Sequence, residues 1–441
     1  MSLKDKASLI FKPSRYKAGT AYSFRGTDFT FTRASTATRV NASGLIEDVA
    51  SGVPRLSYDP TALTKDPALL LEPSRTNFLS NSNGFSSWTT YQAGVVANAA
   101  ISPDGTSNAF KLINNSGTSY HFINFSYSGT TIAKSFFVKA AEYDAVGITS
   151  RSSYSFSVVF DLTRKTSTTA FDSGSIVAGH GIEEYANGWF RVWVYVTSTV
   201  QMNIHAIPSS YTGTLQGSDM PGDGTSGIYI WQAQIEGGRY PTSIIRTSGS
   251  TATRDIDIAK KTSASSVIGQ SEGTIYVEFE YTGVKEHYSP LFSLQGVGSP
   301  MELIEIYAGI NGTQYAAVMQ DGGVTQFNNG FTPSIGKNKV AFAYATNNSV
   351  LVVNGKVIGS VDTACTIPTL YDIGLGSFTY SSSYSLGDSI NEALLFKQRL
   401  SAEELTSLTS FDDYEELVDA KGLTWESSTI TNNRLSELAA L

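Results

Sequence analysis

The chain has 441 residues, a length that favours two or three domains over a single core. Hydrophobic residues make up 41%, too many for a disordered chain, while charged residues reach only 16% and leave much of the remainder to Ser, Thr, Asn, Gly and Tyr. The net charge of −8, without a long basic run, argues against binding of nucleic acid through its phosphates. Cys365 is the only cysteine, which excludes an internal disulfide and a cysteine-based zinc site.

The N-terminal sequence Met1-Ser-Leu-Lys-Asp-Lys6 lacks the apolar core of a signal peptide, and no apolar run approaches membrane-spanning length. We therefore expect synthesis and folding in a cytoplasm, without insertion into a membrane.

Residues 1–82 combine turn signals with short extended pieces. The turns are expected at 41–44 and 51–54, and the extended pieces at 29–32 and 55–58. A segment of this length without regular structure is seldom ordered alone. We expect 1–82 to be an extended attachment region that packs on a neighbouring domain or on a partner chain.

Residues 83–247 are dominated by alternation of period two, which predicts strands. In 189–196, Trp189, Trp193 and Tyr195 fall on one face, and a Val-rich row falls on the other and should meet the core. No helical stripe separates the predicted strands, so the sheets should be antiparallel. The pattern predicts a β-sandwich over 83–247.

A connector over 248–270 leads to a second β module, predicted over 271–410. Asn354-Gly355 lies between two apolar runs and predicts a type I′ hairpin, because both central residues need positive φ. Ser401 and Glu404 have the spacing of a capping box and predict a short helix. A tail over 411–441 carries weak helical patterns. The predicted fold class is all-β, with two antiparallel β-sandwich (jelly-roll) domains after an extended N-terminal region and a short helical C-terminal tail.

Short motifs follow one another in a fixed order from Thr32 to Arg254. In the N-terminal region they are Thr32-Arg-Ala-Ser-Thr-Ala-Thr38, Ser43-Gly-Leu-Ile46, Val53-Pro-Arg-Leu-Ser-Tyr-Asp59, Leu69-Leu-Leu-Glu72 and Arg75-Thr-Asn77. Downstream they are Asn187-Gly-Trp-Phe-Arg191, Gly227-Ile-Tyr-Ile-Trp231, Gln234-Ile-Glu236, Tyr240-Pro-Thr-Ser243 and Thr251-Ala-Thr-Arg254. In this order they resemble a module of bacteriophage tail and virion structural proteins.

By this resemblance, 83–247 looks like a carbohydrate-binding-module type of jelly roll and 271–410 like a laminin-G/concanavalin A-like domain. The resemblance implies a non-enzymatic structural component of a virion (tail, fibre or baseplate), made in the cytoplasm of a bacterial host. Its implied partners are other virion proteins, further copies of itself (a trimer, by analogy with fibres) and host-surface carbohydrate. The alternatives are a glycan-binding receptor module as the main role, a head fibre or capsid decoration protein and, ranked last, a polysaccharide-degrading enzyme.

Enzymatic chemistry finds little support in the sequence. A glycosidase needs two carboxylates about 5–10 Å apart, and Glu278 and Glu280 would share a strand face at about 7 Å, while Glu183 and Glu184 are adjacent. Solvated strand faces carry such residues commonly, and we favour that interpretation. We predict no catalytic residue and no enzyme activity.

Asp104 and Asp223 each precede a glycine in a polar loop and are the candidates for calcium. Neither belongs to an Asp-x-Asp-x-Asp-Gly loop, and Asp-Gly is first a turn signal. We predict no cofactor and leave a structural calcium open.

Aromatic side chains supply the candidate glycan contacts, because their rings are flat platforms for sugars. The candidates are Trp189, Trp193 and Tyr195, together with Tyr380 and Tyr384 in a Tyr-Ser cluster. A place in the core or in an intersubunit contact is the competing interpretation for the first three, and an ordinary polar loop for the other two.

Overall fold

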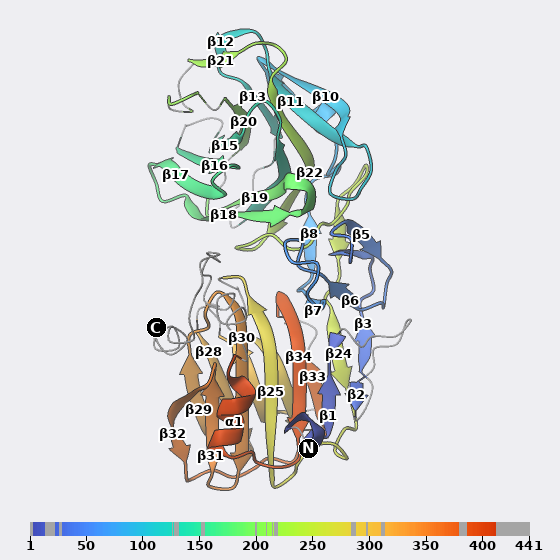
Figure 1. Cartoon of the computed structure of the whole chain (residues 1–441), viewed down its shortest axis with the longest axis vertical. Helices are drawn as coiled ribbons and strands as arrows, with labels where there is room; N and C mark the ends of the chain where they lie inside the picture. Colours follow the sequence, from blue (N-terminus) through green and yellow to red (C-terminus); the bar gives the residue numbers. More distant parts are fainter. Residues whose placement is uncertain are drawn as a thin grey trace, which may run out of the picture. The chain divides into compact units, whose positions relative to one another are not determined.

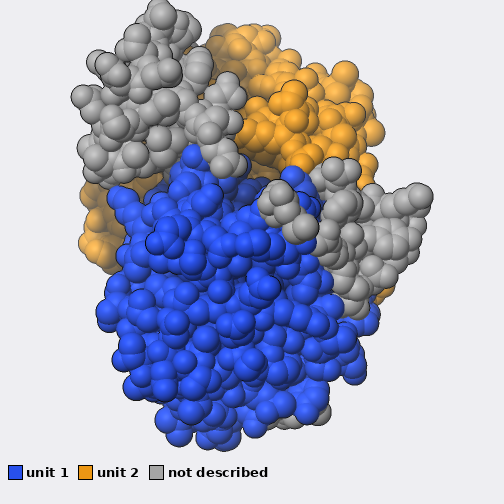
Figure 2. All heavy atoms as spheres, turned by 60° about the horizontal axis from the view of Figure 1, so that its bottom comes forward, with its two compact units in different colours: residues 1–32, 68–73, 256–441 blue, residues 33–67, 74–255 orange. Residues whose placement is uncertain are grey.

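The computed structural model describes residues 3–13, 23–25, 29–125, 127, 132–150, 155–198, 201–208, 210–213, 215, 219–283, 288–296, 299–309, 314–378 and 386–411. The chain forms two compact units, each assembled from separate stretches of sequence. Unit 1 comprises residues 1–32, 68–73 and 256–441, and unit 2 comprises residues 33–67 and 74–255 (Figure 2).

Unit 2 contains two six-stranded antiparallel sheets, in the orders β10-β11-β22-β14-β19-β18 and β17-β16-β15-β20-β13-β9 (Figure 1). The two-stranded pairs β4-β5, β8-β23 and β12-β21 accompany them. The elements are β4 (Ala37–Val40), β5 (Ile46–Val49), β6 (Arg55–Ser57), β8 (Arg75–Asn77), η3 (Phe85–Ser87), β9 (Thr89–Tyr91), β10 (Ala93–Ala100), β11 (Ala109–Asn114), β12 (Gly117–Ser119), β13 (Phe122–Phe125), β14 (Ile132–Ala140), β15 (Ala145–Ser150), β16 (Phe156–Asp161), β17 (Thr166–Asp172), β18 (Val177–Tyr185), η4 (Ala186–Gly188), β19 (Trp189–Val196), β20 (Met202–Ile207), β21 (Met220–Gly222), β22 (Gly227–Gly237) and β23 (Ala252–Arg254).

The apolar faces of the two six-stranded sheets share one core. Val192, Val194 and Val196 of β19 are completely buried there, packed with side chains such as Phe136 of β14 and Phe156 of β16. The prediction that the Val-rich face of 189–196 meets the core is confirmed. Burial of this row supplies hydrophobic stabilisation in proportion to the apolar area removed from water.

Unit 1 contains a second sandwich. One sheet runs in the order β2-β1-β34-β25-β30-β31-β32, with β7 also paired to β34, and the other in the seven-stranded order β29-β28-β27-β26-β33-β24-β3. The elements are η1 (Leu3–Lys6), β1 (Leu9–Phe11), β2 (Ser23–Arg25), β3 (Thr30–Thr32), β7 (Ala68–Leu71), β24 (Ile258–Lys261), β25 (Glu272–Tyr281), β26 (Ser289–Gly296), β27 (Ser299–Ala308), β28 (Tyr315–Asp321), β29 (Val324–Phe331), β30 (Gly336–Ala345), β31 (Ser349–Val353), β32 (Lys356–Asp362), β33 (Asp372–Leu375), β34 (Asp388–Phe396) and α1 (Ala402–Thr409).

Two local predictions for this unit are confirmed. Asn354 and Gly355 take φ of 47° and 76° and join β31 to β32, with Val353 opposite Lys356, as a type I′ hairpin requires. Ser401 accepts a hydrogen bond from the Glu404 amide and Glu404 returns one to Ser401, which completes the capping box of α1. Helix α1 lies over β30 and β31 (Figure 1), where Leu405 joins an apolar cluster.

The N-terminal residues lie within both units. Strand β1 pairs with β34 in unit 1, with Leu9 opposite Leu395, whereas β4, β5 and β8 belong to unit 2. The stretch 248–270 contains β23 and β24. The predicted domain boundaries stay predictions, and 412–441 lie outside the described residues.

Over the residues that the structure describes, the chain is all-β as predicted, with two antiparallel sandwiches and one short α-helix near its C-terminal end. Among the described residues, no helix combines the length and the apolarity needed to cross a membrane.

Candidate functional site

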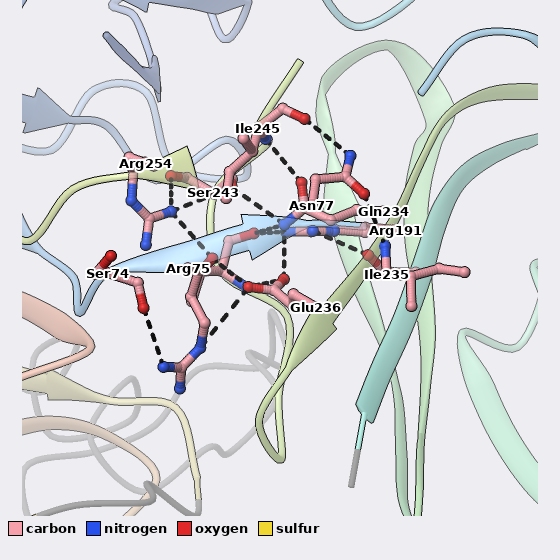
Figure 3. Close-up of polar contacts among 12 residues, drawn as sticks. Ser74, Arg75, Asn77, Arg191, Gln234, Ile235, Glu236, Ser243, Ile245 and Arg254 are labelled. Carbon is pink, nitrogen blue, oxygen red and sulfur yellow. Dashed lines mark hydrogen bonds and ion pairs between the residues drawn. The ribbon is translucent and has the colours of Figure 1, made fainter. Parts of the chain in front are cut away.

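The sequence motifs converge on one buried carboxylate in unit 2, that of Glu236 (Figure 3). Glu236 and Gln234 lie on β22, on the face of the sheet turned away from the core, and Glu236 is 0% exposed. One carboxylate oxygen accepts bonds from the Thr242 amide (2.8 Å) and from Gln234 Nε2 (2.6 Å). The other accepts from Thr242 Oγ1 (2.6 Å), with Arg75 Nε at 3.9 Å. A buried charge is tolerated only with such a set of donors.

Three buried arginines hold the segments around this carboxylate. Arg191 of β19 donates to the Thr242 carbonyl (2.7 Å) and to Ser135 Oγ (2.9 Å). Arg254 donates to Thr242 Oγ1 (3.0 Å) and Ser243 Oγ (3.1 Å). Arg55 also donates to Ser243 Oγ, at 2.7 Å. The stretch around Thr242 is thereby joined to residues far away in sequence.

Asn77 of β8 completes the arrangement with its amide. Its Nδ2 donates to the Ile245 carbonyl (2.9 Å), and its Oδ1 accepts from the amides of Leu79 and Ile235, both at 3.1 Å. All three bonds are made to main-chain groups, and Figure 3 shows Asn77 beside two of the partners, Ile235 and Ile245. Arg75, Arg191, Glu236, Thr242 and Arg254 therefore form a structural network rather than an open binding surface.

This arrangement also explains the burial of Trp189. Val40 and Ile46, from β4 and β5, pack with Trp189, Phe137 and Trp231 in a second apolar cluster. Trp189 is 1% exposed and donates from Nε1 to the Ile101 carbonyl at 3.1 Å. The sequence did not predict that the N-terminal segment covers this face of the sheet.

Trp193 is different, because its indole remains partly exposed at the edge of the same face. It lies opposite Gly181 of β18 and Ser135 of β14. A Cβ on Gly181 would lie 2.7 Å from the indole Nε1, and one on Gly179 would lie 3.4 Å from Cζ3. The ring therefore lies along β18 over two residues without side chains, and Trp193 is partly exposed. We call Trp193, Gly179 and Gly181 the indole platform.

The other predicted contact residues differ in placement. Tyr195, the neighbour of Trp193 on the same strand face, is 8% exposed. Tyr380 and Tyr384 lie outside the described residues. Glu183 is opposite Arg191 and half-buried, and it flanks the indole platform on β18.

The candidate glycosidase carboxylates have cationic neighbours. Glu184 contacts Lys165 at 2.7 Å, and Glu278 lies 3.7 Å from Lys337. Glu280 is half-buried on the same strand as Glu278.

The two calcium candidates, Asp104 and Asp223, accept hydrogen bonds from residues of their own loops. Burial acts to raise the pKa of Asp104, but hydrogen bonds from Ser102 and Thr106 outweigh it, and the pKa falls. Hydrogen bonds from the Ser226 side chain and amide lower the pKa of Asp223. The described residues contain no cluster of three or more His, Cys, Asp or Glu that could hold a metal ion.

No protein-family model matches the sequence, and no curated protein matches it. Among solved structures, the chain is similar to the CBM40 module of the Ruminococcus gnavus IT-sialidase bound to α2,3-sialyllactose, with 20% identity and a TM-score of 0.29 over 33% of this chain and 87% of that one. It is also similar to the leech intramolecular trans-sialidase complexed with 2,7-anhydro-Neu5Ac, with 19% identity and a TM-score of 0.30 over 34% of this chain and 25% of that one. The Trypanosoma rangeli sialidase in complex with 2,3-difluorosialic acid gives 10% identity and a TM-score of 0.29 over 68% of this chain and 60% of that one. Similarity of this extent identifies neither a function nor a ligand for this chain.

The network gives a first prediction. Replacing Thr242 by Val removes the hydroxyl that donates to Glu236 and accepts from Arg254, and leaves both charges short of a partner. We expect a loss of about 2–3 kcal/mol in the free energy of unfolding of unit 2, measured by chemical denaturation. Thr168→Val, at an exposed position of β17, is the matched control. Equal midpoints for the two variants would refute a stabilising role for the network.

Proposed function

We propose that the chain is a non-enzymatic structural component of a bacteriophage particle, and that unit 2 binds a host-surface glycan on the indole platform. The observation that carries the glycan proposal is the partly exposed Trp193, whose indole lies over Gly179 and Gly181. An indole already packed along β18 loses little conformational freedom when a ligand binds to it.

The chemistry beside the platform suits a sugar. An aromatic face packs against the C–H groups of a pyranose ring, and nearby polar groups hold its hydroxyls. Glu183, on β18 beside Gly181, offers a carboxylate at the edge of the platform. Arg191 is already bonded to Thr242 and Ser135, so we assign it to positioning rather than to ligand contact. A core tryptophan would be fully enclosed, as Trp189 and Trp231 are.

The virion proposal rests on the motif order from Thr32 to Arg254, which resembles the phage structural module. Those motif residues build the Glu236 network, so the resemblance concerns the way unit 2 folds. The proposal of a non-enzymatic role rests on the cations beside the carboxylates. Glu184 contacts Lys165, Glu278 lies 3.7 Å from Lys337, and Glu392, which is opposite Glu278 on β34, is paired with Lys4.

The glycan proposal predicts that Trp193→Ala abolishes binding to an array of bacterial surface oligosaccharides, since the platform is removed. Pairs of stacked aromatic rings contribute about 0.5–1.5 kcal/mol beyond the area they bury. A phenyl ring at position 193 keeps part of such a stacking surface, so Trp193→Phe should retain weakened binding. Phe171→Ala is the control, because Phe171 is an exposed aromatic on the other sheet of the same unit, at 41%. Unchanged binding by Trp193→Ala would rule out this site, and binding by no variant or wild-type chain would rule out the function.

A second substitution tests the platform without removing the ring. A side chain at Gly181 would collide with the indole at 2.7 Å, so Gly181→Val should displace the ring from β18. We expect at least a tenfold loss of glycan affinity, or about 1.4 kcal/mol, with a shifted tryptophan fluorescence maximum. Gly174→Val is the control, because a Cβ there would meet only Ile176, at 3.5 Å or more. A Gly181→Val chain with wild-type affinity would contradict the platform.

The virion proposal makes its own prediction. Antibodies against the purified chain should label intact phage particles in electron micrographs, and particles should contain the chain by mass spectrometry. Mass photometry of the purified chain should show a homo-oligomer, with a trimer as the state expected by analogy. Particles that form and infect normally without the chain would count against a structural role.

A further inference from the structure

Glu305 occupies an unusual position at the middle of the seven-stranded sheet of unit 1. It lies on β27, directly opposite Ser293 of β26 and Val318 of β28. Its neighbours Ile304 and Ile306 face the other way, into the apolar interior, so Glu305 belongs to the outer face of this sheet. Nevertheless, Glu305 is 0% exposed.

Neither carboxyl oxygen of Glu305 has a hydrogen-bond partner among the described residues. Burial raises the pKa of this carboxyl to about 8, so the group is protonated at neutral pH. A buried polar group without partners costs about 1–3 kcal/mol and contributes nothing to the fold in return. Such groups concentrate at sites that use their hydrogen bonds for another purpose.

The surroundings of Glu305 combine polar and aromatic groups. Ser293 and Gln295 are fully buried on the same face, and Gln295 Nε2 donates to Ser293 Oγ at 2.8 Å. Tyr307, two residues along β27, lies 4.5 Å from Tyr288 between ring centroids. Tyr288 is stacked on Phe378 at 5.5 Å and 11°. Hydroxyl, amide and carboxyl groups beside aromatic rings match a saccharide, with its hydroxyls and its apolar C–H faces.

We propose that the Glu305 carboxyl, with Ser293 and the Tyr307 ring, is the hydrogen-bonding centre of a saccharide-binding site on the outer face of the seven-stranded sheet of unit 1. In its protonated form the carboxyl offers one O–H donor and one carbonyl acceptor, a pair that suits adjacent sugar hydroxyls. Because Glu305 is fully enclosed, access for the sugar requires side chains over this face to move. This inference concerns unit 1 and does not depend on the indole platform of unit 2.

Few charged or titratable groups among the described residues face this position. Lys260 of β24 lies in the same cross-strand row, beyond Gly374 and Ser293. Asp372 of β33 is opposite Gln295, one row away, and Tyr307 shares the face. On β28 the flanking residues are Val318, Ala316 and Gln320, none of which titrates.

The experiment uses the full chain carrying Trp193→Ala, so that only binding outside the indole platform is measured. The probe is the same array of bacterial surface oligosaccharides, followed by calorimetry with the strongest one. We expect binding at pH 7, an at least tenfold loss in Glu305→Leu, which lacks both the donor and the acceptor, and retention within about threefold in Glu305→Gln, which keeps both. Binding to no oligosaccharide, or equal binding by the Glu305→Leu chain, overturns the proposal.

The pH dependence adds a readout that a structural role would not produce. Affinity should fall above pH 8, where Glu305 ionises and loses its O–H donor, and the Glu305→Gln chain should show no such fall. A wild-type profile identical to that of Glu305→Gln overturns the proposal.

The unfolding temperature distinguishes a binding role of Glu305 from a structural role. The carboxyl ionises near pH 4.5 in the unfolded chain and near 8 in the folded chain, so the folded state loses relative stability as the pH rises through this window. Glu305→Leu should therefore unfold at a temperature equal to or above that of the wild type at pH 8. A clear decrease in that temperature would assign Glu305 to the fold and overturn the proposal.

Discussion

The architecture of unit 2 depends on the enclosed carboxylate of Glu236. Its donors come from the Thr242 turn and from Gln234 on its own strand, while Arg75 approaches from β8. A carboxylate removed from water is costly unless its lone pairs are met, so the surrounding segments must be in place together. The layer formed by residues 33–67 is joined to this network through Arg55, which donates to Ser243 Oγ, and packs on the sheet through Val40 and Ile46. It also determines which part of the sheet remains accessible.

One accessible part of this sheet is its edge at β18. Towards β22 the outer face of the sheet is covered by the cluster of Val40, Ile46, Trp189 and Trp231. Trp193 lies one strand from the edge, where its neighbour β18 contributes two glycines instead of side chains. Bulky residues at these positions would have filled the space that the indole occupies. The covering layer and the glycines together leave Trp193 partly exposed, while Tyr195 and Trp189 on the same strand are buried.

Period-two alternation was sufficient to predict the fold class and the strand at 189–196, because each strand buries one apolar face. The Asn354-Gly355 hairpin and the Ser401 capping box were predictable because their chemistry is local. The placement of β1 beside β34 was not predictable from the sequence, because it depends on a pairing between residues nearly 390 positions apart. For the candidate site, the sequence named both Trp193 and Trp189 as possible glycan contacts. It could not show that Trp193 is partly exposed and Trp189 buried, because the residues that cover Trp189 are distant in the sequence. The alternating Gly179-His180-Gly181 was the one local signal of the platform.

Glu236 and Glu305 are both completely buried carboxyl groups on outer sheet faces, yet their surroundings are opposite. Glu236 receives three hydrogen bonds at 2.6–2.8 Å and lies beside arginine, so its burial is balanced by contacts that join the fold. Glu305 has a serine and a valine opposite it and no hydrogen-bond partner among the described residues, so its burial is a net cost. A folding role accounts for the burial of Glu236 but not for the burial of Glu305. An apolar side chain at 305 would serve the sandwich better, and the carboxyl there is best explained by a group that it binds.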